Sequence, residues 1–198
     1  MLIARSLWEA EVYVALKLAE AEPPAGAEPR PAPPLEPGRS ITEGPDAWVY
    51  ASPVGELTVP YESERSSSLT GAHFGLGRSR LIDAAEWVKI AHLYGERAVE
   101  DQMHFAAEPP PEGDDPEYRK RRHYVELGWE LAAEAIVQAM QFLPEGADKV
   151  PDTEIWSEFG ATSVANDPHL VTRARLEEDL EYYRGVLQDF RDLHSAEG

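Results

Sequence analysis

A helical periodicity in the second half of the chain constrains its fold more than any other feature. Apolar residues recur there at intervals of three and four, the spacing that places side chains on one face of an α-helix. The three apolar stripes are Trp87, Ile90, Ala91, Tyr94, Ala98 and Phe105; Tyr118, Val125, Trp129, Ala132, Ile136, Met140 and Leu143; and Leu176, Leu180, Tyr183, Leu187 and Phe190. Each stripe must be buried against another element, so the pattern predicts a bundle of three long helices.

Residues at the ends of these stripes have the chemistry of helix caps. Asp83 followed by Glu86 forms a capping box, in which each side chain accepts a hydrogen bond from a free amide of the first turn. Asp115-Pro116 and Asp167-Pro168 each place a capping acid before a proline, which predicts that helices begin there. The bundle domain is therefore expected over residues 83–198.

Two shorter segments accompany the long helices in this prediction. A short helix is expected over about 153–159, ending at Gly160. Residues 62–79 are rich in serine and glycine, and the segment 63–82 is predicted to be a loop that leads into the bundle.

The first 62 residues predict a smaller unit. Ser6 and Glu9 form another capping box, and the apolar spacing after it indicates a helix over about 7–20, although residues 11–16 fit a strand equally well. Residues 22–38 hold seven prolines and should form an extended connector. Two β-rich runs flank Ser52-Pro53-Val54-Gly55, which predicts a hairpin. The expected fold class is α+β, mostly α.

Composition excludes several classes of partner. The formal net charge is -19, with 37 acidic residues against 18 lysines and arginines, and both nucleic acid and anionic membranes attract positive charge. Nucleic-acid and membrane binding are therefore not expected, whereas a basic protein partner is compatible with this charge. Zero cysteine excludes disulfides and thiolate metal sites. Charged residues interrupt the apolar part of the first twenty residues, which argues against a signal peptide and favours a cytoplasmic protein.

Several segments resemble a family of uncharacterised proteins from high-GC bacteria. They are HFGLGRSRLIDAAEWVKIAHLY at 73–94, FLPEGADKVPDTEIW at 142–156 and RARLEEDLEYYRGVL at 173–187. The resemblance implies a front end like a zinc ribbon, with knuckles at Pro23-Pro24-Ala25-Gly26 and Ser52-Pro53-Val54-Gly55. Every zinc-binding cysteine of such a ribbon is missing here, so its hairpin would be held by packing instead. The resemblance implies architecture and no activity.

Histidine–carboxylate pairs on two helices are the candidates for a metal site. Asp101 and His104 are three residues apart on the first long helix, and His123 and Glu126 are three apart on the second. A dinuclear bundle site needs further glutamates from other helices, all pointing inward, so these four residues are weak candidates beside an interpretation as solvated helix-end residues. No metal or other cofactor is predicted.

The only dense basic run is Arg119, Lys120, Arg121 and Arg122, followed by His123. Cations in a first helical turn oppose the helix dipole at a cost of up to about 1 kcal/mol. That cost indicates another purpose, either a docking surface or intramolecular ion pairs. Trp48 and Tyr50 alternate with Val49 in the hairpin, so one hairpin face could pack while the other binds a partner. All five tryptophans are otherwise expected to anchor the core.

No motif predicts catalysis. The glycine-rich segment 71–79 lacks the phosphate-loop pattern, and its glycines are better explained by tight turns. Ser66, Ser67 and Ser68 lie near His73 in sequence, but nothing in the sequence orients that histidine.

We therefore expect a non-enzymatic acidic interaction protein, such as an adaptor or an antitoxin-like or immunity-like inhibitor of a basic protein. A structural subunit of a larger assembly is an alternative. A metal-dependent bundle enzyme that uses His92, His104 or His123 is another.

Overall fold

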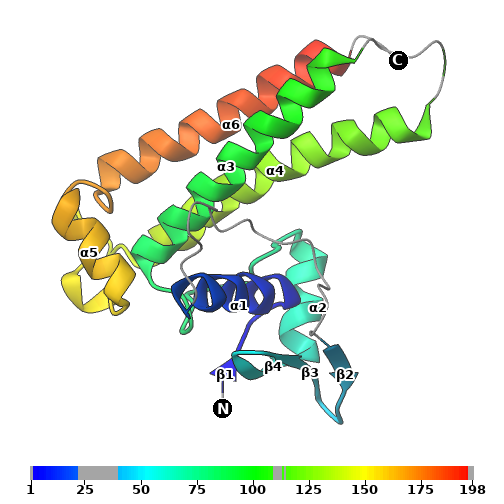
Figure 1. The fold of residues 1–198 in the computed structure, drawn as a ribbon. Helices are drawn as coiled ribbons and strands as arrows, with labels where there is room; N and C mark the ends of the chain where they lie inside the picture. Colours follow the sequence, from blue (N-terminus) through cyan, green and yellow to red (C-terminus); the bar gives the residue numbers. More distant parts are fainter. Residues whose placement is uncertain (1, 22–39, 109–112, 114, 196–198) are drawn as a thin grey trace.

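The computed structural model describes residues 2–21, 40–108, 113 and 115–195. Within them the fold is α+β, with six α-helices, a short 3-10 helix and one four-stranded sheet (Figure 1). The elements are β1 (Leu2–Ile3), α1 (Leu7–Ala21), β2 (Ser40–Glu43), β3 (Ala47–Ser52), β4 (Gly55–Pro60), α2 (Tyr61–Thr70), α3 (Ala84–Ala107), α4 (Pro116–Met140), η1 (Asp152–Glu154), α5 (Glu158–Asn166) and α6 (Arg173–Ser195).

The sheet has the order β1-β4-β3-β2. The predicted hairpin is confirmed as β3 and β4, which pair antiparallel up to the turn that joins Ser52 to Gly55. The first strand of the chain adds in parallel to β4, with Leu2 opposite Leu57. Tyr50 and Leu57 are directly opposite each other in the register and both are buried.

Helix α1 lies between the sheet and the long helices (Figure 1). The segment 11–16, which fitted a strand equally well in the sequence, is therefore helical. Ala10, Val12, Val14 and Leu16 are all buried, because α1 has protein on both sides. The connector predicted over 22–38, including Pro23-Pro24-Ala25-Gly26, lies outside the described residues.

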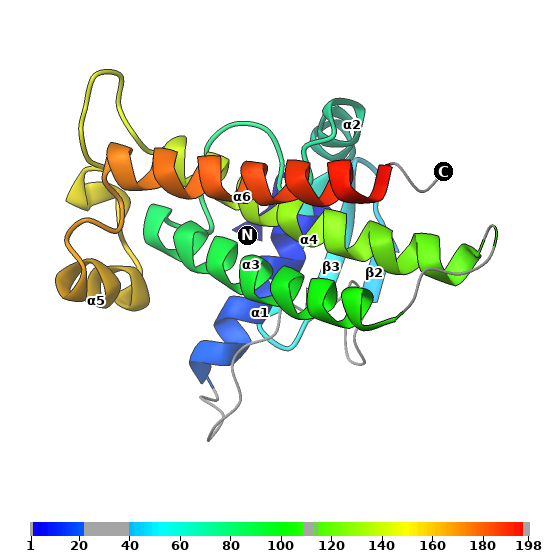
Figure 2. The ribbon, with the colours of Figure 1, turned by 90° about the horizontal axis from the view of Figure 1, so that it is seen from above.

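The three longest helices, α3, α4 and α6, run alongside one another above the smaller unit (Figure 2). Trp129 of α4 packs beside the ring of Tyr183 of α6, and Gly95 of α3 lies against the same ring. At Gly128 the helices α3 and α4 approach so closely that an added Cβ would lie 2.9 Å from Cβ of Ala98. The middle of α4 is buried on almost every side, since the junction with the N-terminal unit covers what α3 and α6 leave open.

The prediction of a loop over 63–82 was wrong for its first part, because Tyr61–Thr70 forms α2. This serine-rich helix satisfies its own polar side chains: the hydroxyl of Ser67 donates to the carbonyl of Ser63, and that of Thr70 donates to the carbonyl of Ser66. Gly71 ends the helix in the left-handed conformation. Ser67 is buried where α2 packs against the rest of the protein.

Two further boundaries differ from the prediction. The segment expected as one helix over 153–159 is instead a 3-10 turn and then α5, which begins after the cap Ser157 and continues through Gly160 to Asn166. Asp167 and Pro168 do not begin the last helix, which starts at Arg173. Asp167 instead accepts a hydrogen bond from the amide of His169 in a turn.

Of the helices in the described part of the chain, none is long and apolar enough to cross a lipid bilayer.

Candidate interaction site

The four candidate metal ligands are not assembled into a metal centre among the described residues. Asp101 lies 3.0 Å from Arg97, and Glu126 lies 2.8 Å from Arg122 and 3.2 Å from Arg191. His104 is exposed, and His123 packs beside the ring of Tyr124. No group of three histidines, aspartates or glutamates comes close enough to hold a metal in this part of the chain. Both carboxylates of the candidate set bind guanidinium groups.

The basic run at the start of α4 joins the far ends of the neighbouring helices. Arg121 lies 2.8 Å from Glu108 at the end of α3. Arg122 bonds to Glu126 and also donates to the carbonyl of His194 at the end of α6, at 2.9 Å. Lys120 is 4.0 Å from Glu117, while Arg119 is exposed. These contacts favour the interpretation of the run as a set of intramolecular ion pairs.

The two aromatic candidates of the hairpin have different surroundings. Tyr50 is 1% exposed and its hydroxyl donates to Glu11 of α1, so a partner does not reach it in this fold. Trp48 is half-buried and meets Tyr61 edge to face, with ring centroids 5.2 Å apart. The face of the hairpin that carries both residues is thus the packed one.

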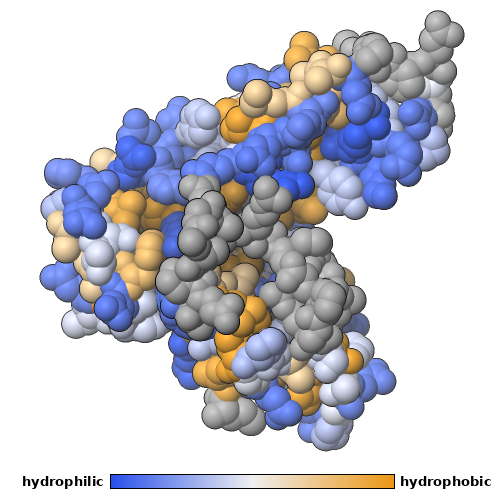
Figure 3. Space-filling view, viewed as in Figure 1, coloured by the Kyte–Doolittle hydropathy of each residue, from blue (hydrophilic) through white to orange (hydrophobic). Residues whose placement is uncertain are grey.

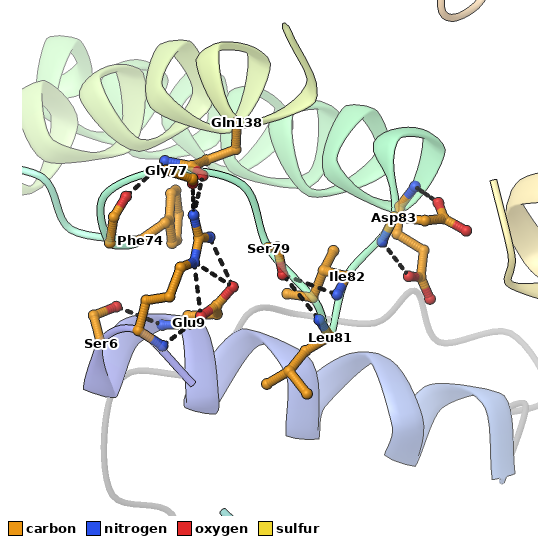
Figure 4. Close-up of polar contacts among 12 residues, drawn as sticks. Ser6, Glu9, Phe74, Gly77, Ser79, Leu81, Ile82, Asp83 and Gln138 are labelled. Carbon is orange, nitrogen blue, oxygen red and sulfur yellow. Dashed lines mark hydrogen bonds and ion pairs between the residues drawn. The ribbon is translucent and has the colours of Figure 1, made fainter. Parts of the chain in front are cut away.

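A loop of residues 71–83, here called the junction loop, connects the N-terminal unit to the bundle (Figure 4). Arg5 lies against the part of this loop that holds Gly75 and Gly77. The Arg5 guanidinium donates to the carbonyl of Gly77, to Oε1 of Gln138 at 2.9 Å and to the buried carboxylate of Glu9 at 2.7 Å. Gln138 in turn donates to the carbonyl of Gly75 at 3.0 Å. Glu9 therefore balances the charge of Arg5. The Arg5 side chain links the start of α1, the junction loop and α4.

Of the glycines in the junction loop, Gly75 has the least space for a side chain. Gly75 has a φ of +96°, and a Cβ added there would lie 2.5 Å from Cβ of Arg5. The close approach allows the loop backbone to pass directly over Arg5. The tight turn predicted for these glycines thus brings the loop backbone against the ion pair of Arg5 and Glu9.

His73 is oriented by a carboxylate of α4, which the sequence did not indicate. Its Nδ1 lies 2.8 Å from Oε2 of Glu134, and the same carboxylate accepts the amides of His73 and Phe74 at 3.1 and 2.8 Å. The hydrogen bond to Glu134 raises the pKa of His73, against the lowering effect of its burial. In the neutral ring Nδ1 carries the proton, and Nε2 is then an acceptor.

The cap of α3 also fixes a segment far along the chain. Asp83 is fully buried and accepts the amide of Glu86 at 2.9 Å, completing the predicted capping box. Its other oxygen accepts the amides of Trp156 and Ser157 at 3.0 and 2.8 Å. Gly160 packs against this carboxylate, since a Cβ there would lie 2.8 Å from Oδ2. Asp83 thus holds the backbone that carries Trp156.

Trp156 is 48% exposed, unlike Trp87 and Trp129 in the core. One side of the indole rests on buried Phe142, with ring centroids 5.8 Å apart. A pocket of about 540 Å³ beside it is lined by Arg78, Ser79, Arg80, Glu154 and Trp156. Arg78 lies over the Phe142 ring and 2.8 Å from Glu154. The expectation that every tryptophan anchors the core was therefore wrong for Trp156.

The segment that carries Trp156 is strongly acidic. Residues 141–172 contain Glu145, Asp148, Asp152, Glu154, Glu158 and Asp167 against a single lysine, Lys149, and no arginine. In Figure 3 the end of the molecule around α5 shows apolar patches among hydrophilic ones. We call Trp156, Asp152, Glu154 and Glu158, together with the buried Phe142 beneath the indole, the Trp156 surface.

In comparisons with protein-family models, curated proteins and solved structures, nothing matches this chain. The resemblance described above therefore stays an expectation, and function must be argued from the geometry.

Proposed function

We propose that this protein is a non-enzymatic acidic interaction module, an adaptor or an antitoxin-like or immunity-like inhibitor, that docks a basic protein through the Trp156 surface. One observation carries the proposal: a half-exposed tryptophan whose backbone is fixed by the buried carboxylate of Asp83. Tryptophan is strongly enriched among the residues that dominate binding energy. An anchor whose backbone is already ordered loses less entropy when a partner binds.

The class of partner follows from the acidic excess of the segment that carries the anchor, although Arg78 and Arg80 line the pocket beside the indole. The acids of segment 141–172 would attract a lysine- and arginine-rich surface, which raises the association rate and selects against acidic proteins. Asp152 and Glu158 lie on opposite sides of Trp156 in sequence and both are exposed. The salt dependence of binding should therefore come from these residues, and the residence time from the indole.

The two alternatives have less support. A structural subunit would use the same surface, but no feature of the described residues favours a permanent assembly over a reversible complex. A metal-dependent enzyme would need carboxylates that here bind arginines, as Asp101 and Glu126 do.

The test is affinity capture of the tagged protein from its native cells at low and high salt, repeated with variants. Trp156→Ala should lose the specific partner at both salt concentrations, with at least a tenfold lower affinity. Tyr182→Ala is the matched control, because Tyr182 is also an exposed aromatic residue, at 57%, but lies on α6. Equal capture by both variants would contradict the proposal.

Substitutions that neutralise acidic residues separate the electrostatic contribution to binding from the contribution of the indole. Asp152→Asn combined with Glu158→Gln should slow association and flatten its salt dependence with little effect on dissociation. Glu177→Gln combined with Glu181→Gln makes the same change in charge on α6 and should leave association within twofold of wild type. A partner that is itself acidic would overturn the proposed charge complementarity.

A further inference from the structure

A second site shares no residue with the Trp156 surface. A cavity of about 150 Å³ lies where the start of α1, the last turns of α2 and the junction loop meet. Trp8, Glu64, Ser67, Ser68, Gly71 and His73 line it. Ser68 and Gly71 are exposed, which opens the cavity to solvent. An apolar cavity of about 150 Å³ engineered in another protein holds benzene, so a ligand of about that size fits.

The carboxylate of Glu64 gives this cavity a negative charge. Its Oε2 accepts the amide of Leu7 at 2.8 Å, and no lysine or arginine among the described residues forms an ion pair with it. The side chain is only partly exposed. A partly buried carboxylate with no cation beside it favours a cationic ligand, because pairing would compensate the cost of its desolvation.

The C-terminus of α2 adds to the negative potential. The carbonyls of Ser67 and Ser68 point beyond the end of the helix and accept the amides of Ala72 and Gly71, at 3.0 and 3.4 Å. The carbonyl end of a helix carries a partial negative charge of about half an elementary charge. The amide end of α1, where Leu7 donates to Glu64, carries an opposite partial charge of similar size, so the carboxylate of Glu64 decides that the cavity disfavours an anion.

Aromatic rings form another part of the wall. Trp8 and His73 meet edge to face, with ring centroids 5.6 Å apart and an angle of 86° between the planes. Indole attracts cations through its electron-rich face. When His73 is neutral its Nε2 is an acceptor, because Nδ1 donates to Glu134. The cavity thus combines an indole ring, a carboxylate and, at a pH above the raised pKa of His73, an imidazole acceptor.

We propose that this cavity binds the ammonium group of a small alkylamine, either as a free molecule or at the end of a lysine side chain. Carboxylate, indole and acceptor groups together recognise an alkylammonium ion and reject carboxylates and phosphates.

The test uses the full chain and heteronuclear NMR of its five indole N–H groups. The Trp8 signal, assigned with Trp8→Phe, is followed during titration with n-butylammonium chloride. The neutral control is 1-butanol, which has the same number of heavy atoms, and sodium butyrate is the anionic control. Butylammonium should shift the Trp8 signal saturably, and the two controls should bind at least tenfold more weakly. Equal binding of 1-butanol, or no response to any probe, would overturn the proposal.

Glu64→Gln removes the charge while keeping an acceptor for the amide of Leu7. It should lower the affinity for butylammonium at least tenfold. Glu62→Gln makes the same change at an exposed position of α2 outside the cavity and should leave the affinity within twofold. Unchanged affinity in a folded Glu64→Gln variant would also overturn the proposal.

A third experiment decides whether the ammonium group belongs to a free amine or to a lysine side chain. A capped lysine peptide that binds at least tenfold more tightly than butylammonium, and loses this binding on lysine acetylation, would assign the cavity to a partner's lysine. Equal or weaker binding of the peptide would assign it to a free amine. These measurements need no protein partner, so they are independent of capture through Trp156.

Discussion

Nδ1 of His73 lies 2.8 Å from Oε2 of Glu134, and this contact ties the junction loop to α4. The proton of Nδ1 and the two neighbouring amides all point at one carboxylate. Protonation of His73 strengthens the contact, since an imidazolium pairs with the carboxylate. The strength of this contact between the junction loop and α4 therefore depends on pH.

Stability should fall relative to a His73→Asn variant as pH rises. Glu134 and Glu130 raise the pKa of His73 in the folded protein, and burial lowers it. A folded pKa above the unfolded value, about 6.5, stabilises the protein fully below that pH. The contribution is lost as pH rises through the folded pKa. The free energy of unfolding, measured in urea between pH 5.5 and 8.5, tests this.

Asparagine at position 73 keeps a donor for Glu134 but does not titrate. His169→Asn is the control, because His169 is exposed. A difference between wild type and His73→Asn that is the same at all pH values would contradict the prediction.

Replacement of Asp83 should be costly. The carboxylate accepts three amides and is fully buried, so Asp83→Ala leaves them without partners at about 1–3 kcal/mol each. We expect a loss of at least about 3 kcal/mol in urea unfolding, and a smaller loss for Asp83→Asn. Asp115→Ala removes an exposed cap and should cost about 1 kcal/mol. Equal losses for the two alanine variants would show that Asp83 is only a local cap.

Two glycines of the junction loop form a matched pair. Both have positive φ, but Gly77 has open space where a Cβ would lie, whereas at Gly75 the Cβ would meet Arg5. Gly77→Ala should cost about 1 kcal/mol from backbone strain alone. Gly75→Ala should cost about 3 kcal/mol, because overpacking adds to the strain. Thermal and urea unfolding measure the difference, and similar costs would mean that the loop moves away from Arg5 easily.

Arg122 should matter more than its neighbour Lys120. Arg122→Ala removes the bonds to Glu126 and to the carbonyl of His194. Because 30% of the side chain is exposed, the expected loss is only about 1 kcal/mol. Lys120→Ala should stay within about 0.5 kcal/mol of wild type. Hydrogen exchange should also be faster in the last turn of α6 in Arg122→Ala alone; unchanged exchange there would contradict the assigned contact.

Features set by neighbours in sequence were predicted well. The caps at Asp83 and Asp115 and the turn at Ser52–Gly55 depend on residues within four positions, and the structure confirms them. Asp167-Pro168 has the same local pattern but forms a turn, since an Asp side chain caps a turn and a helix by the same bond. The local pattern therefore predicted where a new element begins, but not always whether that element is a helix or a turn.

Contacts between distant residues were not predictable. Arg5 and Glu9 are ordinary charges in the sequence, and nothing nearby indicates Gln138 or Gly77 as partners. The second role of Asp83, which fixes Trp156, likewise depends on a segment 73 residues away. The helix α2 escaped prediction because its serines favour loops unless docking and back-bonding compensate.

The long-range hydrogen bonds of Arg5 can form only late in the synthesis of the chain. Its partners Gly77 and Gln138 follow it by 72 and 133 residues. At roughly 5–20 residues per second, the ribosome needs on the order of ten seconds to deliver the last of them. During that interval α1 can pack on β3 and β4, which precede residue 61, but the guanidinium of Arg5 has no Gln138 to donate to. The link that Arg5 makes between the start of α1 and α4 therefore forms only after residue 138 leaves the exit tunnel, later than the packing of α1 on the sheet.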